Sequence, residues 1–424
     1  MLIGAVADDI TGATDLCLML SRSGLKTVQV IGLPDPAGAW PEADAVVIAL
    51  KSRTIPAAAA VEMSVQAGRA LQRAGARQIL FKYCSTFDST DAGNIGPVAE
   101  ALMVLTGADL TIACPSFPAA GRTVYKGHLF VGDRLLSESP LKDHPLTPMR
   151  DPDLVRVLGR QTSLPVGLID IATVREGVAS VRRAFDAARA AGTRMLVTDT
   201  LTEEDLLTLG AACADMPLVT GGSGIGLGLA ANLSAGRPAS GGSRMAAPDG
   251  RSVILAGSCS EATRGQIEKA RAAGLPLLAL DVHAVASGSQ TAREIANWVI
   301  SQYPDSIPLV YSSAAPETLD HIQKMLGRDA SGALVERTLA EVARCLRDAG
   351  FTRFLIAGGE TSGAVVAALD VKMLAIGPEI APGVPWTRSL VGPDLALALK
   401  SGNFGGPDFF LTAWSMLEPE GKDV

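Results

Sequence analysis

The sequence predicts an α/β fold of two domains, each a mostly parallel sheet flanked by helices. Short apolar runs rich in β-branched residues alternate with longer Ala-rich segments in both halves of the chain. The 424 residues are too many for a single ordinary core. Residues 234–251 read SAGRPASGGSRMAAPDGR, without periodicity, which is typical of a linker. We therefore expect domains at residues 1–235 and 251–424, joined by a linker at 236–250.

The first half alternates expected strands with expected helices. A helix over residues 57–74 begins after Pro56 and stops at Gly75, and another over 178–191 stops at Gly192. Proline near a helix start and glycine just past its end are the usual asymmetry. The expected strands are residues 2–6, 27–31, 45–50, 78–83, 110–114, 194–198 and 218–220.

The second half resumes the same alternation. We expect strands at residues 252–256, 277–281, 309–311, 353–357 and 373–376, and helices at 261–273, 291–301, 338–349 and 363–369. Continuous apolar strands joined by helices indicate parallel sheets covered on both faces. Such sheets bind ligands at the carboxyl ends of their strands. The residues that follow each strand are therefore the candidates for function.

Composition excludes several classes of protein. Hydrophobic residues make up 48% and charged residues 19%, which argues against disorder. A net charge of -7 disfavours a nucleic-acid partner. The apolar run from Leu2 to Ala7 is too short for a signal or a membrane span. The six cysteines form no Cys-x-x-Cys pair, so we expect neither disulfides nor structural zinc, and a cytoplasmic protein.

Two adjacent carboxylates, Asp8 and Asp9, follow the first expected strand, and Thr11, Gly12 and Asp15 come next at a helix start. Capping by Asp9 or Thr11 would explain one acidic residue but not the pair. Phosphoryl transfer to a hydroxyl needs a carboxylate that orients or deprotonates it. We interpret the pair as functional, with capping as the alternative.

Basic and hydroxyl side chains follow two further strands. Arg53 lies in Lys51-Ser52-Arg53-Thr54, and Lys82 begins a run that contains Ser85 and Thr86. An Arg fork pairs with a carboxylate, and hydroxyls can contact a sugar. These residues predict a pocket for a small carboxylate or polyol. The alternative is surface charge beside turn-forming residues.

Three other segments are less specific. Residues 220–228 read TGGSGIGLG, which fails the G-x-G-x-x-G pattern at Leu227. Close strand–helix packing is the preferred interpretation there, with nucleotide binding as the alternative. Residues 115–152 are expected to be a long irregular segment, such as a lid or binding loop. His128 and His144 within it have no partner at metal-ligand spacing.

The second half contains the ingredients of a phosphate site. Ser258 and Glu261 have capping-box spacing, so Ser258 reads as a helix cap or as the edge of a phosphate site. The run Gly358-Gly359-Glu360-Thr361-Ser362-Gly363, between a strand and a helix, predicts a cradle for an anion. The Walker A pattern is absent from the sequence. A further glycine-rich loop over residues 399–408 could cover a nucleotide.

These segments together resemble the four-carbon acid sugar kinase family. The matching pieces are ADDITGATD at 7–15, KSR at 51–53, KYCSTFDSTDAGNIGP at 82–97, FPAAGRTVYKGHLFVGD at 117–133, AGSCS at 256–260, GGETSG at 358–363 and LKSGNFGG at 399–406. Within the family, LLSESPLKDHPLTPM at 135–149 is most similar to the 3-oxo-tetronate 4-kinases. Threonate or erythronate 4-kinase activity is the alternative within the family.

The resemblance implies that the first domain binds the acid sugar and the second binds ATP, with the active site in the interdomain cleft. It implies substrate contacts at Asp8, Asp9, Arg53, Lys82, Ser85 and Thr86. It implies nucleotide contacts at Ser258, Gly359, Glu360, Thr361, Ser362, Gly363 and Gly405.

We expect a mechanism in which ATP and Mg²⁺ occupy the second domain and the linker allows closure over the acid sugar. Asp8 or Asp9 orients or deprotonates the terminal hydroxyl, and Lys82 stabilises charge on the transferred group. The sequence does not choose between the two Asp residues, and it assigns no metal ligand. The alternatives are a nicotinamide-dependent oxidoreductase acting on a small hydroxy acid, and a non-catalytic acid-sugar-binding protein. No membrane partner is expected, and a homodimer is left open.

Overall fold

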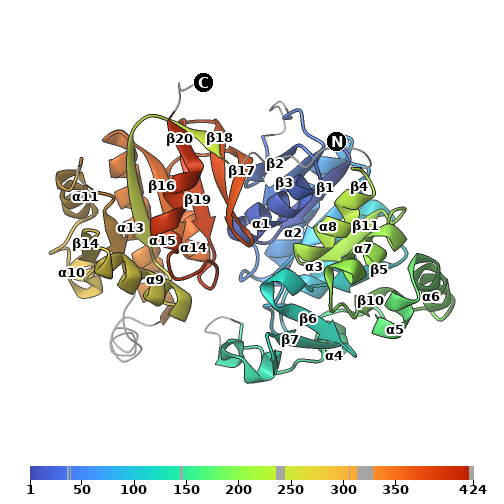
Figure 1. The fold of residues 1–424 in the computed structure, drawn as a ribbon. Coiled ribbons are helices and arrows are strands. Elements are labelled where there is room, and N and C mark those ends of the chain that lie inside the picture. Colours follow the sequence, from blue (N-terminus) through green and yellow to red (C-terminus); the bar gives the residue numbers. More distant parts are fainter. Residues whose placement is uncertain are drawn as a thin grey trace. The chain divides into compact units, whose positions relative to one another are not determined.

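A computed structural model describes residues 1–35, 38, 40–143, 147–234, 244–304, 306–312 and 328–419. The chain divides into two compact units, residues 1–241 and 242–424. Each unit consists of a sheet with helices packed along it (Figure 1). The predicted α/β fold with mostly parallel sheets is therefore confirmed.

The sheet of the first unit is parallel throughout its described strands. All residues of its central strands are buried, as continuous apolar strands between two helical layers require. The sequence predicted every strand except the edge strand β9, a short, half-exposed segment that contains a glycine. In sheet order the strands are β2 (Thr27–Ile31), β3 (Ala45–Ala49), β1 (Ile3–Ala7), β4 (Gln78–Lys82), β11 (Leu218–Gly221), β5 (Thr111–Cys114), β10 (Met195–Thr198) and β9 (Val166–Ile169).

Helices of the first unit connect these strands, and α1 packs against α8 while α2 packs against α3. The helix predicted after Pro56 is α2, which ends before Gly75 as expected. The helices are α1 (Ile10–Arg22), α2 (Ala57–Arg73), α3 (Ile95–Thr106), α4 (Leu154–Gln161), α5 (Ile171–Arg175), α6 (Val178–Ala190), α7 (Glu203–Ala212) and α8 (Gly224–Ala231).

The glycines of residues 221–228 serve close packing. A Cβ at Gly228 would lie 2.1 Å from the carbonyl oxygen of Leu206 on α7. At Gly226 it would lie 2.6 Å from the side chain of Leu16 on α1. Since real Cβ atoms do not approach so closely, α8 can contact both helices only with glycine at these positions. The segment is thus closely packed at these two positions, but helix against helix, whereas the sequence analysis expected strand against helix.

The prediction of one long irregular segment over residues 115–152 is wrong in its middle part. Strands β6 (Arg122–Tyr125), β7 (His128–Val131) and β8 (Arg134–Leu135) form a small antiparallel sheet there. Its tight turns use glycines, with Gly127 at φ 74° and Gly132 at φ 63°. Such glycines are a hairpin signal that the sequence analysis did not use. Short 3-10 turns flank it at Pro118–Ala120, Leu136–Glu138 and Pro140–Asp143. His128 lies in β7, and His144 lies outside the described residues.

The sheet of the second unit is mixed. Its first five strands are parallel, whereas β18 runs antiparallel to both of its neighbours. The sequence analysis missed β18 and β19 and ended β17 too early, because Pro and Gly interrupt the apolar pattern of β17 and β18. In sheet order the strands are β14 (Leu277–Ala279), β15 (Leu309–Tyr311), β13 (Arg251–Ala256), β16 (Phe351–Ala357), β19 (Ala396–Lys400), β18 (Val384–Val391) and β17 (Met373–Ala381).

The remaining elements complete the second unit. Trp386 is fully buried in its core and donates its indole N–H to the carbonyl of Ala413 at 2.8 Å. Strand β12 (Met245–Ala247) pairs with β20 (Leu417–Pro419), so part of the segment expected to be a linker is a strand. The helices are α9 (Glu261–Ala272), α10 (Val282–Ser287), α11 (Ala292–Ser301), α13 (Arg328–Asp348), α14 (Gly359–Ala368) and α15 (Phe409–Thr412), followed by a 3-10 turn at Ala413–Met416. No helix among the described residues has the length and apolarity needed to cross a bilayer.

Candidate functional site

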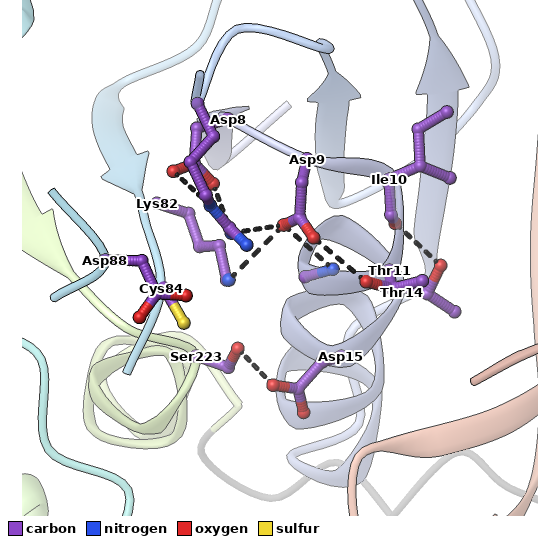
Figure 2. Close-up of polar contacts among 12 residues, drawn as sticks. Asp8, Asp9, Ile10, Thr11, Thr14, Asp15, Lys82, Cys84, Asp88 and Ser223 are labelled. Carbon is purple, nitrogen blue, oxygen red and sulfur yellow. Dashed lines mark hydrogen bonds and ion pairs between the residues drawn. The ribbon is translucent and has the colours of Figure 1, made fainter. Parts of the chain in front are cut away.

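The carboxyl ends of neighbouring parallel strands bring four of the predicted residues together. Asp8 and Asp9 follow β1, and Lys82 ends β4, where it stands opposite Ala7 in the ladder. Arg53 follows β3, and its backbone N–H donates to the carbonyl of Asp8 at 3.2 Å. Figure 2 shows Asp8, Asp9 and Lys82 around the start of α1. The sequence prediction that they share one site is consistent with this geometry.

Arg53 binds both carboxylates of the pair. Its Nε and Nη2 donate to Asp8 at 2.9 and 2.8 Å, and Nη2 also donates to Asp9 at 2.7 Å. The side-chain amide of Asn94 donates to the carbonyls of Ser52 and Arg53 at 2.6 and 3.1 Å, which fixes the loop that carries the guanidinium. Nη1 of Arg53 makes no hydrogen bond to the described residues. One edge of the guanidinium therefore stays available to an incoming anion.

Asp9 has two roles at once. It caps α1 by accepting the backbone N–H of Gly12 at 3.1 Å, and it accepts the hydroxyl of Thr11 at 2.9 Å. Its carboxylate also lies 3.9 Å from the ammonium of Lys82. The capping alternative for Asp9 is thus correct, but the same oxygens face two cations. Capping and a role in the site coexist.

Gly12 is a site residue that the sequence analysis did not select. A Cβ there would lie 2.2 Å from Oδ1 of Asp9 and 2.2 Å from Nζ of Lys82. Only glycine lets the Lys82 ammonium rest against the first turn of α1. The signal was present in the sequence as the glycine three residues after the second Asp of the pair.

Asp15 and Ser223 extend the cluster and were missed as site residues. The hydroxyl of Ser223, at the start of α8, donates to Oδ2 of Asp15 on α1 (Figure 2). Oδ1 of Asp15 is buried without a hydrogen-bond partner among the described residues. Burial raises the pKa of Asp15 to about 6, although the Lys82 ammonium and the Ser223 hydroxyl act to lower it.

Burial and charge act oppositely on the two adjacent carboxylates. Burial raises the pKa of Asp8 above its ordinary value, and the Arg53 guanidinium only partly offsets this. Burial also acts to raise the pKa of Asp9, but Arg53, Lys82, Thr11 and Gly12 together lower it below its ordinary value. Asp9 is therefore ionised at neutral pH.

The loop after β4 contributes hydroxyls beside this cluster. The Sγ of Cys84 and the hydroxyl of Thr86 are 2.9 Å apart, and Thr86 donates to Asp88 at 2.6 Å. Burial raises the pKa of Cys84 to about 11, so the thiol stays protonated at neutral pH. Ser85 is half-buried, and its hydroxyl makes no hydrogen bond to the described residues.

In the second unit, the loops after β13 and β16 meet closely at the carboxyl edge of the sheet. Helix α14 begins at Gly359, so residues 359–363 form its first turns and not a loop before it. A Cβ at Gly257 would lie 2.1 Å from the hydroxyl of Thr361, which shows how closely the loop after β13 approaches the first turn of α14. The hydroxyl of Ser362 is buried without a partner among the described residues. The unpaired N–H groups of a helix N-terminus make this edge suitable for an anion.

The interpretation of Ser258 as a helix cap is wrong. The N-cap of α9 is Ser260, whose hydroxyl accepts the backbone N–H of Thr263 at 3.3 Å. The hydroxyl of Ser258 instead accepts the N–H of Ser260 at 3.2 Å. Ser258 therefore precedes the helix. It lies close to the loop after β19, because a Cβ added at Gly402 would lie 2.5 Å from the Ser258 hydroxyl. Gly405, the other predicted nucleotide contact, has φ 80° in the loop after β19.

No group of three or more His, Cys, Asp or Glu in the described part of the chain is arranged to hold a metal ion.

Comparisons with known proteins also divide the chain into two parts, close to the two compact units of the structure. The family model described as "Sugar-binding N-terminal domain" matches residues 3–229, and "Nucleotide-binding C-terminal domain" matches residues 253–410. Proteins named 3-oxo-tetronate kinase from Burkholderia multivorans and Pseudomonas fluorescens are 52% and 51% identical, over 98% of this chain and 97% of each relative.

Two solved structures share the fold over nearly the whole length. A Salmonella typhimurium LT2 protein, described as a candidate tRNA synthase, has a TM-score of 0.86 and 43% identity, with 97% of this chain and 98% of that chain covered. A Haemophilus influenzae protein has a TM-score of 0.78 and 43% identity, with 97% and 99% covered.

Proposed function

Since the chain belongs to the four-carbon acid sugar kinase family, we propose that it transfers the γ-phosphoryl group of ATP to the 4-hydroxyl of 3-oxo-tetronate. The observation that carries this proposal is the cluster of Asp8, Asp9, Arg53 and Lys82 at the strand ends of the first unit. It combines cations for a carboxylate and a phosphoryl group with carboxylates for a hydroxyl. A small acid sugar offers the carboxylate and the hydroxyl, and ATP offers the phosphoryl group.

Each residue has a proposed task in the first unit. Nη1 of Arg53 binds the carboxylate of the acid sugar, and Ser85 and Thr86 contact its hydroxyls. Asp9 orients or deprotonates the terminal hydroxyl, because its side chain is 21% exposed whereas that of Asp8 is 4% exposed. Asp8 then holds Arg53 in place through two hydrogen bonds. Lys82 stabilises negative charge on the transferred group.

The second unit binds the nucleotide in this proposal. The N-terminus of α14, with Gly359 to Gly363, receives phosphate oxygens, and Ser258 and Gly405 border the same site. Mg²⁺ would enter with ATP, since Mg²⁺ is usually held by phosphates, waters and one or two carboxylates. When bound, it would supply positive charge that neutralises the phosphates.

The test is ADP release from the purified protein with Mg·ATP and a panel of four-carbon acids. The panel contains 3-oxo-tetronate, threonate and erythronate of both hands. Turnover confined to 3-oxo-tetronate supports the proposal, and turnover confined to threonate or erythronate keeps the kinase but changes its substrate. ADP release with none of these acids would contradict the proposed function.

Two other functions make different predictions in the same assay. An oxidoreductase would bind NAD(P)H, which fluorescence reports, but Gly226 and Gly228 pack against α1 and α7. A non-catalytic binding protein would bind the acid sugar without consuming ATP. The description of the Salmonella relative as a candidate tRNA synthase finds no support in the net charge of -7.

A further inference from the structure

The loop of residues 401–406, between β19 and α15, surrounds a buried ammonium group. Four oxygen atoms lie within hydrogen-bond distance of the Lys400 Nζ. They are the hydroxyl of Thr263 at 3.1 Å and the carbonyls of Ser401, Gly402 and Phe404 at 3.2, 2.8 and 3.1 Å. A cage of neutral oxygens around one cation resembles the carbonyl-lined sites that replace the hydration shell of a monovalent ion.

Lys400 has no carboxylate partner among the residues that the structure describes. Its exposed fraction is 0%, and within the described part of the chain no Asp or Glu forms an ion pair with it. Transfer of an unpaired ammonium from water into the protein interior is unfavourable unless dipoles or an anion compensate. Oxygen dipoles supply part of that compensation, and an anionic ligand near the loop would supply the rest.

The hydrogen bonding of the loop does not require this ammonium. The carbonyl of Ser401 also accepts the N–H of Phe404 at 3.1 Å. The carbonyl of Gly402 also accepts hydroxyls from Ser260 and Thr263 at 2.6 and 2.9 Å. Likewise, the carbonyl of Phe404 accepts the amide of Gln266 at 3.1 Å. Every carbonyl of the cage keeps a donor without Lys400, so what Lys400 alone contributes is its charge.

The same loop also offers hydrogen-bond donors. The backbone N–H groups of Gly402, Asn403 and Gly405 donate to none of the described residues. Their loop follows β19, which pairs with β16 at the same edge where α14 begins (Figure 1). Unpaired N–H groups with a positive charge behind them favour an anion.

We propose that Lys400 is a positioning residue of the nucleotide site, where its buried ammonium adds a positive charge within the 401–406 loop that attracts the phosphates of ATP. This inference rests on the proposed function, in which the second unit binds ATP. Lys400 does not itself touch the nucleotide. It acts through its charge.

The experiment compares the wild-type protein with Lys400→Met by titration calorimetry, using Mg·ATP, Mg·ADP and adenosine as probes. Methionine has a similar volume and no charge. We expect the affinity for Mg·ATP to fall by about tenfold or more, because a fixed charge near the phosphates is lost. Adenosine affinity should change by less than about twofold, since adenosine carries no phosphate. Lys372→Met is the matched control, because Lys372 is 61% exposed and pairs with Asp370.

Chemical rescue provides a second readout that a merely structural role would not give. Lys400→Ala leaves the oxygen cage with space for a small cation. Ammonium or methylammonium chloride should then restore Mg·ADP affinity by severalfold, whereas tetramethylammonium chloride at the same ionic strength should not. Equal effects of the three salts would overturn the inference.

The outcomes separate the inference from the function on which it rests. Wild-type protein that fails to bind Mg·ADP overturns both. If wild-type protein binds and Lys400→Met binds Mg·ATP equally well, or loses adenosine and ATP affinity by the same factor, only the inference falls. Should Lys400→Met not fold, Lys400→Gln replaces it, because its amide can still donate within the cage. If neither variant folds, the ammonium is needed for the loop itself and the inference is wrong.

Discussion

At the scale of single residues, the site alternates charges of opposite sign. Asp8, Arg53, Asp9 and Lys82 follow one another through contacts of 2.7–3.9 Å. Each cation therefore contacts a carboxylate in the absence of a ligand, which compensates the desolvation of a buried charge. In the proposed function the carboxylate of the acid sugar binds Nη1 of Arg53, so the hydrogen bonds from Nε and Nη2 to the Asp pair stay in place.

The first prediction separates the two Asp residues. Asp9→Asn should lower kcat by about 10²–10⁴-fold, because the amide cannot accept the proton of the hydroxyl. The KM for ATP should change by less than about threefold, because the substitution removes no contact that ATP makes equally in the ground state and the transition state. Steady-state kinetics with 3-oxo-tetronate measures both constants. Asp8→Asn is the comparison and should mainly raise the KM for the acid sugar, through a displaced Arg53. Near-normal turnover in both variants would refute the assignment.

The second prediction concerns Gly12. Gly12→Ala places a methyl group 2.2 Å from Nζ of Lys82, so the ammonium must move. We expect kcat/KM for the acid sugar to fall by about tenfold or more, since small displacements at a reacting site are costly. Gly159→Ala on α4 is the control, because nothing lies within 4 Å of its added Cβ. Unchanged kinetics in Gly12→Ala would show that Lys82 does not act from this position.

At the scale of elements, a buried carboxylate joins the small antiparallel sheet to the first unit. Asp199 is fully buried after β10 and accepts the N–H groups of Lys126, Gly127 and Ile171 at 2.8, 2.8 and 3.1 Å. Two of these donors lie in the turn between β6 and β7, and the third begins α5. One side chain thus fixes a hairpin and a helix start.

The third prediction follows from these three hydrogen bonds. Asp199→Ala should lower the free energy of unfolding by about 3 kcal/mol, since it leaves buried donors without an acceptor. Urea denaturation of the full chain measures the loss. The control is Asp170→Ala, which removes only the exposed cap of α5 and should cost about 1 kcal/mol. A smaller loss for Asp199→Ala than for Asp170→Ala would contradict the assigned role.

The arrangement of strands and helices also explains which parts of the structure could be predicted from the sequence. The site around Asp8, Arg53 and Lys82 followed from one rule, that parallel strands carry their carboxyl ends to the same edge. The contact of Asp15 with Ser223 spans 208 residues and has no local signature, so it could not be predicted. Ser258 was misread because Ser260 has the same residue type and caps α9 instead. Two nearby serines fit the same local capping pattern, and only the tertiary structure shows which of them caps the helix.

At the scale of the whole molecule, the same buried charged groups affect both the proposed function and the stability of the fold. The family models assign sugar binding to residues 3–229 and nucleotide binding to residues 253–410. In each part an ionisable group is buried with incomplete compensation: Asp15 in the first and Lys400 in the second. Burial lowers the pKa of Lys400 to about 7, so both groups are charged in the folded protein between about pH 6 and 7. Such incompletely compensated charges lower the stability of the fold, and we propose that each provides a charge at the site.

The fourth prediction is a pH-dependent gain in stability from Asp15→Asn. The pKa of Asp15 is about 6 in the folded protein against 3.8 unperturbed, so the folded state binds the proton more tightly than the unfolded state. Wild-type stability therefore falls as pH rises from 4 to 6, while the variant lacks this dependence, because Asn is neutral throughout. The advantage of Asp15→Asn should be about 2 kcal/mol larger at pH 7.5 than at pH 4.5.

Urea denaturation of the full chain at pH 4.5 and 7.5 measures this difference, and Asp186→Asn is the control, since its carboxyl is 78% exposed. The variant should at the same time lose activity, because the negative charge beside Lys82 is gone. A stability difference that is the same at both pH values would mean that Asp15 does not carry the buried charge. Retained activity with the stability gain would mean that the charge has no part in catalysis.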